Sequence, residues 1–448
     1  MRHINGVVKR LSCHKIHFIG IGGVSMSALA ACLAERGCVV TGSDLAPNEF
    51  TAKLENRGVR IFYGHAPENL GDAETVIFSS AVGEKNAELR AARRRGLRVL
   101  SRAELLSLVA EEYDRVVGVA GCHGKTTATA MCAHVLDACA GTCSAHIGGL
   151  DLDYGNFRAG GKNYFVTEAC EYRANFLSLR PSLAVILNTD ADHLESYGSD
   201  EALLSAYKTF ALSAGAAIVC GEDRIASLVP SALTFGLRGG CDVRAEELRV
   251  VKGKYSFLLR VRGRESARVE LNVYGRHNVY NALAAAAVAV YYGYPPALAA
   301  EGLKKFRGIA RRFEKLGSVN GAPLIADYAH HPREIAAAIE TAGALCSGRL
   351  FVVFQPHTYS RTRLLFDSFV SVLSPVENLV IYKTYPAREY FDAAGSALTL
   401  SQSLPNSLYI ERVRELEIYL RCSLRPDDLV LVLGAGDIYY AAKQIVRG

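Results

Sequence analysis

The chain has 448 residues, half of them hydrophobic, which is too many for one ordinary hydrophobic core, so about three domains are expected. The formal net charge is +6, and the main basic run, at residues 90–98, contains no aromatic residue, so we expect no nucleic-acid partner. The twelve cysteines include no C-x-x-C pair, and a chain this long does not need disulfides, so free thiols in a reducing, cytoplasmic compartment are expected.

The stretch from Ile16 to Ala34 is apolar and contains LAAC at residues 29–32, a pattern that also occurs at lipoprotein cleavage sites. Glycines and serines between residues 20 and 27 interrupt this stretch, which favours a strand, a turn and a helix start over a signal-peptide core. No other stretch is long and apolar enough to span a bilayer. We therefore expect no membrane association.

Short β-branched runs alternate with Ala- and Leu-rich helical patterns from Lys15 onward, which is typical of stacked βαβ units. The strand candidates IHFIGI and CVVTGSD are followed by the helical patterns VSMSALAACLAERG and TAKLENRG. We predict a Rossmann-like domain over residues 1–103.

The first glycine-rich loop is GIGGVS at residues 20–25, between a strand and a helix. Small residues there let backbone N–H groups approach a pyrophosphate at the helix start. Asp44 ends the next strand, about twenty residues on, where the dinucleotide fingerprint has a ribose-binding acid. Ser25 stands where the fingerprint has its third glycine. The residues leave open a redox cofactor, a UDP-sugar, or a tight turn without a ligand.

The strongest local motif is GCHGKTT at residues 121–127, which follows the strand RVVGVA and begins a helix. Its backbone N–H groups, the amine of Lys125 and the hydroxyl of Thr126 are the groups that hold nucleotide phosphates and Mg²⁺ in a P-loop. Val119 occupies the position of the first glycine in the full pattern, so this P-loop is a variant.

Two later strands end in groups that could bind a metal. NYFVTEA leads to Cys170 and Glu171, and LAVILNTD leads to Asp192 and His193. Carboxyl ends of strands are where α/β sheets place ligand-binding groups, and Mg²⁺ prefers oxygen ligands. Glu171 with the P-loop hydroxyl would suit one Mg²⁺. The alternative is that the acids only cap helices and the histidine only packs.

The remaining chain continues the α/β pattern with one exception. KYSFLLRVRG and ESARVELNVYG, within residues 241–272, alternate apolar with polar residues as antiparallel strands do. After residue 308, APLIADYAH, RLFVVFQPH, NLVIYKT and DLVLVLGAG are parallel-strand candidates separated by helices. We predict a three-domain α/β fold: the first Rossmann-like domain, a central P-loop domain at 104–308 with a small antiparallel sheet, and a C-terminal Rossmann-like domain at 309–448.

Eight segments in chain order resemble the Mur ligase family of peptidoglycan synthesis. They are HFIGIGGVSMSALA, GCHGKTTATAM, TEACEYRANFLSLRPSLAVILNTDADHLESY, GRHNVYNALAAAAVA, FRGIARRFEKLG, DYAHHPREI, FQPHTYSRTR and LVLGAGDI. The resemblance covers nearly the whole chain. It implies a cytoplasmic enzyme, monomeric or dimeric, that uses ATP and Mg²⁺ to join L-alanine to UDP-N-acetylmuramate through an acyl phosphate.

The resemblance also implies roles for single residues at matching motif positions. Lys125, Glu171, His193 and Arg312 would be catalytic. One Mg²⁺ would lie between Thr126 and Glu171, and His193 would bind a second metal. The ATP contacts would be Gly121, Cys122, His123, Gly124, Lys125, Thr126, Thr127, Asn278, Asn281, Arg312 and Asp327.

The first glycine-rich loop would hold the UDP-sugar rather than a nicotinamide cofactor. The third domain would hold L-alanine, with the planar guanidinium of Arg361 as the partner of its carboxylate. The implied UDP-sugar residues are Gly20, Gly22, Gly23, Ser43, Asp44, His65 and Ser79. The implied amino-acid residues are Tyr328, His330, His331 and Arg361, although the two histidines could also be a surface pair.

The sequence departs from the family pattern at a few positions. Cys122 replaces a threonine, Cys170 and Tyr172 stand where many relatives have Asp and Ser, Ser25 replaces a glycine, and Thr358 replaces an arginine. These changes bear on substrate contacts more than on the chemistry.

Three other functions can be compared with these motifs. A recycling ligase that attaches a tripeptide to the same UDP-sugar shares most of these motifs and stays open. A P-loop regulatory GTPase is disfavoured because the chain has no Asn-Lys-x-Asp or Thr-Lys-x-Asp guanine-binding motif. An NAD-dependent reductase would leave the P-loop, Glu171 and His193 without a role.

Overall fold

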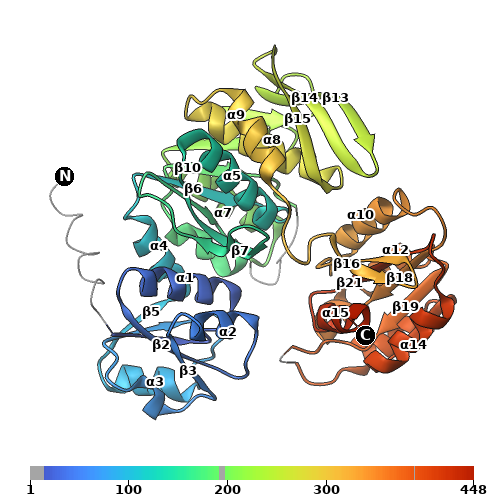
Figure 1. Cartoon of the computed structure of the whole chain (residues 1–448). Helices are drawn as coiled ribbons and strands as arrows, with labels where there is room; N and C mark the ends of the chain where they lie inside the picture. Colours follow the sequence, from blue (N-terminus) through green and yellow to red (C-terminus); the bar gives the residue numbers. More distant parts are fainter. Residues whose placement is uncertain (1–14, 191–196, 388, 448) are drawn as a thin grey trace. The chain divides into compact units, whose positions relative to one another are not determined.

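The computed structural model describes residues 15–190, 197–387 and 389–447 (Figure 1). The chain divides into two compact units. Unit 1 is Met1–Leu248, Ser256–Leu271 and His277–Arg307, and unit 2 is Arg249–Tyr255, Asn272–Arg276 and Gly308–Gly448. No helix in the described part of the chain is long and apolar enough to cross a membrane.

The first sheet of unit 1 has the strand order β3-β2-β1-β4-β5, and each neighbouring pair is parallel. The order reverses between β1 and β4, and the crevice at such a reversal is where open α/β sheets bind ligands. The strands are β1 (Lys15–Ile19), β2 (Val39–Asp44), β3 (Arg60–Tyr63), β4 (Thr75–Phe78) and β5 (Arg98–Ser101).

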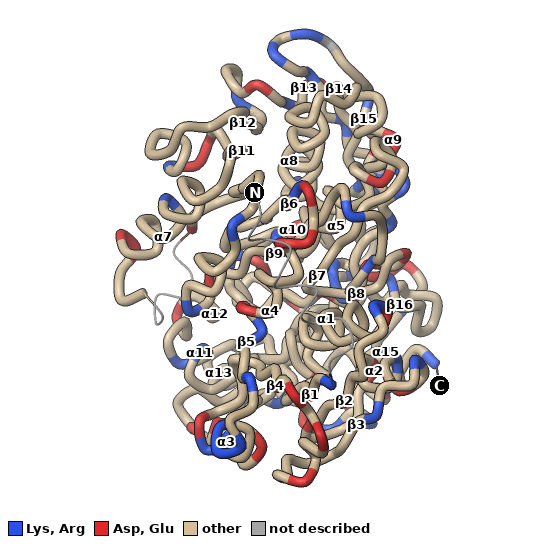
Figure 2. Tube along the Cα trace, turned by 90° about the vertical axis from the view of Figure 1, so that its left-hand side faces the viewer, with Lys and Arg blue, Asp and Glu red and all other residues tan. Residues whose placement is uncertain are grey.

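The helices of this sheet explain two features of the sequence. The residues from Met26 to Leu33 in α1 are all buried, which accounts for the continuous apolar run there. The basic run begins in α3, where Figure 2 shows acidic residues nearby, and Arg93 forms an ion pair with Glu84. The basic run is therefore a solvated helix face. The helices are α1 (Val24–Glu35), α2 (Glu49–Glu55), α3 (Ala87–Arg94) and α4 (Arg102–Ala110), with the 3-10 turn η2 (Pro67–Leu70).

The second sheet is mixed, in the order β15-β14-β13-β12-β11-β10-β6-β9-β7-β8. Its central strands are parallel, and β7 pairs with β8 in the antiparallel sense. The strands are β6 (Arg115–Ala120), β7 (Ser144–Asp151), β8 (Gly155–Arg158), β9 (Tyr164–Glu168), β10 (Leu183–Ile186), β11 (Ala216–Cys220), β12 (Leu233–Gly236), β13 (Val243–Val251), β14 (Lys254–Val261) and β15 (Arg264–Tyr274).

The predicted antiparallel segment consists of β13, β14 and β15. Two-residue connections join these strands, and so short a connection permits only antiparallel neighbours. Lys252 and Gly253 have φ of 48° and 69°, and Arg262 and Gly263 have 49° and 76°, the left-handed pairs that a tight type I′ hairpin requires. Because β12 and β13 are parallel neighbours, the segment continues the main sheet and does not form a separate one.

Helices of the second sheet share one hydrophobic core with the first sheet. A single cluster of buried residues contains Phe18 and Leu29 of the first sheet region together with Phe165 and Phe210 of the second. The two sheets of unit 1 therefore pack as one body, and the predicted boundary at residue 103 stays a prediction. The helices are α5 (Lys125–Ala140), α7 (Asp200–Ser213), α8 (His277–Tyr291) and α9 (Pro296–Lys305), with the turns η3 (Tyr172–Ser178) and η4 (Arg224–Ser227).

Unit 2 contains the third sheet, in the order β16-β17-β21-β18-β19-β20, which is parallel except for the β16–β17 pair. Its two faces are covered by separate cores: Phe351 and Val353 of β18 lie in one, and Val352 and Phe354 lie in the other. The strands are β16 (Glu314–Val319), β17 (Ala322–Asp327), β18 (Leu350–Phe354), β19 (Asn378–Tyr382), β20 (Ser407–Ile410) and β21 (Leu429–Leu433).

The helices of unit 2 follow its parallel strands, as in a Rossmann-like fold. They are α10 (Pro332–Gly343), α11 (Tyr359–Leu364), α12 (Phe366–Leu373), α13 (Ala397–Gln402), α14 (Val413–Ser423) and α15 (Ile438–Arg447), with the turn η5 (Ala393–Gly395). The predicted α/β class, with three sheet-based domains, is confirmed.

Candidate active site

The P-loop joins the buried strand β6 to helix α5, which begins at Lys125. Gly121 and Gly124 have φ of 147° and 83°, values that side chains rarely allow. A Cβ atom on Gly124 would lie 2.6 Å from Oδ1 of Asn281. The glycine at this position is therefore required both by the backbone conformation and by the close approach of α8.

Lys125 closes the P-loop and contacts the buried acid of the next strand. Its Nζ donates to the carbonyl of Gly121 at 2.6 Å and to Oε1 of Glu171 at 2.8 Å. Burial opposes the positive charge, but Glu171 together with Cys170 and Glu168 outweighs burial and raises the lysine pKa. The lysine is thus charged and held at the position where phosphate oxygens bind in a P-loop.

Asn188, which follows β10, holds the other side of the P-loop. Its Oδ1 accepts from the backbone N–H of His123 at 3.0 Å, and its Nδ2 donates to the carbonyl of the same residue at 3.0 Å. Cys122 is buried, and its thiol contacts the carbonyl of Asp190 and the hydroxyl of Tyr207. Sequence reasoning missed Asn188, although its place after a buried strand was a possible signal.

Asn281 of α8 lies beside the P-loop glycine Gly124, and Asn278 is hydrogen-bonded to Asn281. Nδ2 of Asn281 donates to Oδ1 of Asn278 at 2.9 Å, and both residues are buried. This bond turns Oδ1 of Asn281 toward Gly124.

The predicted Mg²⁺ ligands fit a hard cation in their chemistry. Thr126, like Thr127, lies in the first turn of α5 with its side chain partly exposed, and Glu171 follows the adjacent strand β9. Glu168 also acts on Lys125, so two carboxylates surround the lysine. An oxygen-rich, acidic site of this kind suits Mg²⁺. His193, the predicted ligand of a second metal, lies outside the described residues, as does Asp192.

The first glycine-rich loop is organised by Asp44 rather than by a cation. Oδ2 of Asp44 accepts from the backbone N–H of Gly22 at 2.7 Å, and Oδ1 accepts from that of Leu45 at 2.7 Å. A Cβ atom on Gly22 would lie 2.5 Å from Nδ2 of Asn48, which explains the glycine. Gly20 has a φ of 80° at the turn, and Gly23 is exposed at the start of α1.

Beneath this loop, Ser43 connects to a buried acid that sequence reasoning missed. The carbonyl of Ser43 accepts from the N–H of Gly20 at 2.8 Å, and its hydroxyl donates to Glu88 at 2.5 Å. Nδ1 of His65 lies 3.1 Å from the same Glu88 oxygen. Burial opposes the charge of Glu88, but the nearby ring of His17 and the hydrogen bonds from Ser43 and Asn69 lower its pKa.

The predicted UDP-sugar residues therefore lie at the carboxyl ends of the strands of the first sheet. Ser43 is fully buried, so its side chain supports the loop from below, while Asp44, His65 and Ser79 are partly exposed. Ser79 follows β4, on the other side of the strand-order reversal, and its Oγ accepts from the N–H of Ala81 at 3.3 Å.

In unit 2, Asp327 ends β17 and holds the segment that precedes β16. Its two oxygens accept from the N–H groups of Phe313 at 2.8 Å and Ala329 at 2.7 Å. Burial raises the pKa of Asp327, while the nearby guanidinium of Arg312 acts in the opposite direction. The same guanidinium lies 5.2 Å from the ring centre of Tyr328.

His330, His357 and Arg361 converge beyond β17 and β18. The rings of His330 and His357 are 5.9 Å apart, and Nη1 of Arg361 lies 3.3 Å from Nδ1 of His357. Burial lowers the pKa of both histidines, that of His357 to about 4, with help from the positive charge of Arg361. The rings are therefore neutral near pH 7, and the guanidinium supplies the positive charge of this cluster.

The structure separates the two adjacent histidines by role. His331 begins α10 as its N-cap and forms a capping box with Glu334. His330 instead points to the ring of His357, and its Nδ1 lies 3.0 Å from the carbonyl of Tyr328.

Sequence reasoning also missed Gln355, the buried residue that precedes His357. Its Nε2 donates to Oδ1 of Asp437 at 2.6 Å, and its Oε1 accepts from the N–H of Ile438 at 3.0 Å. A Cβ atom on Gly436 would lie 2.4 Å from that Oε1. Gln355 thus joins the carboxyl ends of β18 and β21, and the polar FQPH segment after an apolar strand was its signal.

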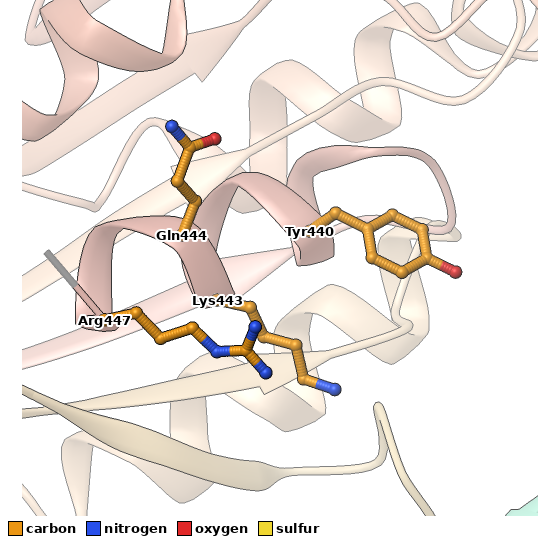
Figure 3. Close-up of a pocket in the computed structure, with 4 residues that line it drawn as sticks. All are labelled: Tyr440, Lys443, Gln444 and Arg447. Atoms are coloured by element: carbon orange, nitrogen blue, oxygen red, sulfur yellow. The ribbon is translucent and has the colours of Figure 1, made fainter. Parts of the chain in front are cut away.

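A hollow of about 510 Å³ lies on unit 2 against α15 (Figure 3). Tyr440, Lys443, Gln444 and Arg447 line it, and they repeat at the helical spacing of one face. None of the predicted site residues lines this hollow, so it is a basic helix face distinct from the clusters above.

Comparison with known proteins identifies related chains along most of the sequence. The models for the Mur ligase family catalytic domain, the Mur ligase middle domain and the Mur ligase glutamate ligase domain match residues 15–114, 119–289 and 311–436. The UDP-N-acetylmuramate–L-alanine ligases of Caldanaerobacter subterraneus and Rubrobacter xylanophilus are 37% and 39% identical. The alignments cover 97% of this chain and 97% of the first relative, and 96% of this chain and 99% of the second.

Solved structures agree with this result. The UDP-N-acetylmuramate–alanine ligase of Thermotoga maritima has a TM-score of 0.85 at 30% identity, over 97% of this chain and 98% of that one. A murein peptide ligase of Psychrobacter arcticus, with a TM-score of 0.73 at 24% identity over 97% and 98%, shares the fold. Since the family models follow one another along the chain and the relatives align over nearly all of it, the chain belongs to the Mur ligase family.

Proposed function

We propose that this protein is an ATP-dependent amide ligase that joins L-alanine to the lactyl carboxylate of UDP-N-acetylmuramate. The observation that carries the proposal is the contact between the P-loop amine of Lys125 and buried Glu171. It occurs in a chain whose full-length relatives are named for this reaction. The three predicted substrates are ATP, the UDP-sugar and L-alanine. The chain has a separate polar cluster of suitable chemistry for the phosphates of ATP, for the UDP-sugar and for the carboxylate of L-alanine.

The chemistry requires activation of a carboxylate, which does not react with an amine on its own. A carboxylate oxygen of the sugar attacks the γ-phosphorus of ATP, the bond to the β-phosphate oxygen breaks, and ADP leaves. The amine of L-alanine then attacks the acyl carbon, inorganic phosphate leaves with the shared oxygen, and the nitrogen loses a proton. Lys125 lowers the free energy of the first step because its charge offsets the negative charge of the phosphoryl group.

Other residues bind and orient the substrates. Thr126 and Glu171 would hold Mg²⁺, which supplies further positive charge to the phosphates when bound. Asn278 and Asn281 fix the geometry of the P-loop from α8. The roles of His193, Arg312 and Asp327 toward metal and ATP remain predictions from the family resemblance.

The amino-acid site is assigned to the cluster of His330, His357 and Arg361. A planar guanidinium binds a carboxylate through two hydrogen bonds, and the histidines beside it are neutral, so they do not compete with it as cations for the substrate carboxylate. Arg361→Ala is expected to raise KM for L-alanine about 100-fold, since a charged hydrogen-bonded pair is lost, while KM for ATP is retained. Arg363→Ala is the matched control, because Arg363 of the same helix pairs with Asp392.

A direct assay tests the proposal. Purified protein is incubated with UDP-N-acetylmuramate, Mg-ATP and either L-alanine or the tripeptide L-alanyl-γ-D-glutamyl-meso-diaminopimelate, and phosphate release and product mass are measured. We expect product with L-alanine and none with the tripeptide. Product with the tripeptide alone would assign the recycling reaction instead, and no product with either would overturn the proposal.

A further inference from the structure

Ser25, which stands in place of the third glycine of the first loop, contacts the second sheet. Its Oγ lies 2.8 Å from Nε2 of His146, a buried residue of β7 that is distant in sequence. Figure 1 shows α1 beside β7, and the two elements are in contact. A glycine at residue 25 would offer no side chain for this bond.

His146 is the centre of a series of hydrogen bonds whose directions are fixed by its ends. Arg102, which only donates, contacts Oγ of Ser25 at 3.3 Å, and the hydroxyl of Thr167 donates to the carbonyl of Glu168 at 3.3 Å. The hydroxyl of Thr167 therefore accepts from Nδ1–H of His146 at 3.0 Å, and Nε2 of the neutral ring accepts from the hydroxyl of Ser25. We call these five residues the His146 network.

The imidazole in this network is neutral. Burial, with the positive charge of Arg102, lowers the pKa of His146 to about 3. Near pH 7 the ring therefore has one donor and one acceptor, which is what Thr167 and Ser25 require on its two sides. An apolar side chain at 146 would leave the buried hydroxyl of Thr167 and the partly buried hydroxyl of Ser25 without this partner.

The network joins the start of α1 to the end of β9, the strand that precedes Glu171. Its first end is in α1, directly after the glycine-rich loop, and its second end is at the carboxyl terminus of β9, three residues before Glu171. Asn156 of β8 adds a second attachment, since its Nδ2 donates to the carbonyl of Val24 at 2.7 Å and to Oγ of Ser27 at 2.9 Å.

We propose that His146 is a positioning residue that fixes the UDP-sugar loop, through Ser25, to strand β9, which leads to Glu171. The inference rests on the proposed function, in which the first loop binds the UDP-sugar. His146 touches no reacting atom. Its loss is expected to weaken UDP-sugar binding and leave the ATP site intact, because Lys125 and Asn281 do not depend on it.

The test compares His146→Leu with His146→Gln and Ser25→Gly. The leucine variant loses both bonds, and we expect its KM for UDP-N-acetylmuramate, and the Kd measured by calorimetry, to rise about tenfold, with KM for ATP unchanged. The glutamine variant keeps an acceptor toward Ser25 and is expected to recover most of the affinity. Ser25→Gly, which cannot misplace a bulky group, is expected to show a rise of a few fold.

His134→Leu is the matched control, because His134 is also buried in unit 1 and bonds to Asp151 at 3.1 Å. We expect a lower Tm in this control but an unchanged Kd for the UDP-sugar. In the double variant, Ser25→Gly with His146→Leu, the Kd should not exceed that of His146→Leu alone. The Ser25–His146 bond that Ser25→Gly removes is already lost in His146→Leu.

The outcomes separate the two proposals. If the wild-type enzyme does not bind UDP-N-acetylmuramate, the proposed function fails and this inference with it. If the wild type binds and reacts but His146→Gln, His146→Leu and Ser25→Gly all match it in Kd, only the positioning role is overturned. The same holds if KM for ATP rises as much as KM for the UDP-sugar.

Discussion

The two glycine-rich loops of unit 1 have the same local form, but the charges around them differ. Each joins a buried parallel strand to a helix, and each has an acid on a neighbouring strand. Asp44 of the first loop accepts directly from a backbone N–H, whereas Glu171 beside the second loop accepts from the amine of Lys125. The first loop therefore has an acid that is satisfied by neutral donors, and the second presents a charged pair.

This difference indicates which loop is suited to phosphoryl transfer. A carboxylate at a strand end, with amide donors around it, is suited to accept from sugar hydroxyls. An amine held by a buried acid is suited to offset the charge that moves in phosphoryl transfer. The anchors differ as well: neutral His146 holds the first loop, while neutral Asn188 and charged Lys125 hold the second.

The largest expected effect comes from removing the charged group of the second loop. Lys125→Ala should lower kcat by about 10³-fold, because the positive charge on the phosphoryl group is lost. It should also destabilise unit 1 by about 3 kcal/mol, since the buried Glu171 charge loses its partner. Steady-state phosphate release and calorimetry with the UDP-sugar are the measurements. Loss of UDP-sugar binding, or turnover close to wild type, would contradict the separation of the two loops.

The corresponding change in the first loop should have a smaller and different effect. Asp44→Asn keeps the size of the side chain but weakens the bonds that Gly22 and Leu45 donate to it. We expect KM for the UDP-sugar to rise about tenfold, with kcat and KM for ATP retained. Glu49→Gln, an exchange of the same kind at the start of α2, is the control. A fall in kcat with unchanged KM would show that the first loop acts in the chemical step.

The two ends of α5 provide a matched pair for the P-loop backbone. Gly124 and Gly141 have similar φ, 83° and 77°. A Cβ atom on Gly124 would lie 2.6 Å from Oδ1 of Asn281, whereas a Cβ atom on Gly141 would meet nothing within 4 Å. Gly124→Ala should cost about 3 kcal/mol in stability and raise KM for ATP, whereas Gly141→Ala should cost about 1 kcal/mol. Denaturant unfolding and ATP kinetics measure both. Equal losses would mean that the contact with α8 is not tight.

The smallest expected effect is a difference in pH dependence between the two anchors. The unfolded chain protonates His146 near pH 6.5 but the folded one only near pH 3, so more protons bind the unfolded state as pH falls below 6.5. The free energy of unfolding should then fall by up to about 1.4 kcal/mol per pH unit. The raised pKa of Lys125 contributes stability that is lost only above pH 10.5. Lys125 therefore does not change the pH dependence of the free energy of unfolding below pH 6.5.

The comparison of wild type with His146→Gln isolates this slope. Both proteins share every other titrating group, including His357, so only the contribution of His146 differs between them. We expect the free energy of unfolding to change less between pH 7 and pH 5 in the variant. Parallel curves would show that His146 is not held neutral in the folded protein.

Elements and motifs that depend on neighbouring residues could be predicted from the amino-acid sequence. The α/β alternation, the two glycine-rich loops and the hairpins β13–β15 follow from β-branched runs, helical periodicity and glycine at turns, all of which act within a few residues. The same local patterns placed Lys125 at a helix start and Asp44 at a strand end, where the structure has them.

Contacts between groups that are distant in the sequence became visible in the folded structure alone. Glu88 lies 45 residues from Ser43 along the chain, Asn188 lies 65 from His123, and His146 lies 121 from Ser25, yet each pair is hydrogen-bonded. It also placed β13–β15 on the main sheet and merged the first two sheets around one core. The physical reason is that local conformational preference sets each strand and helix, whereas the burial of apolar surface and the pairing of buried polar groups select how they combine.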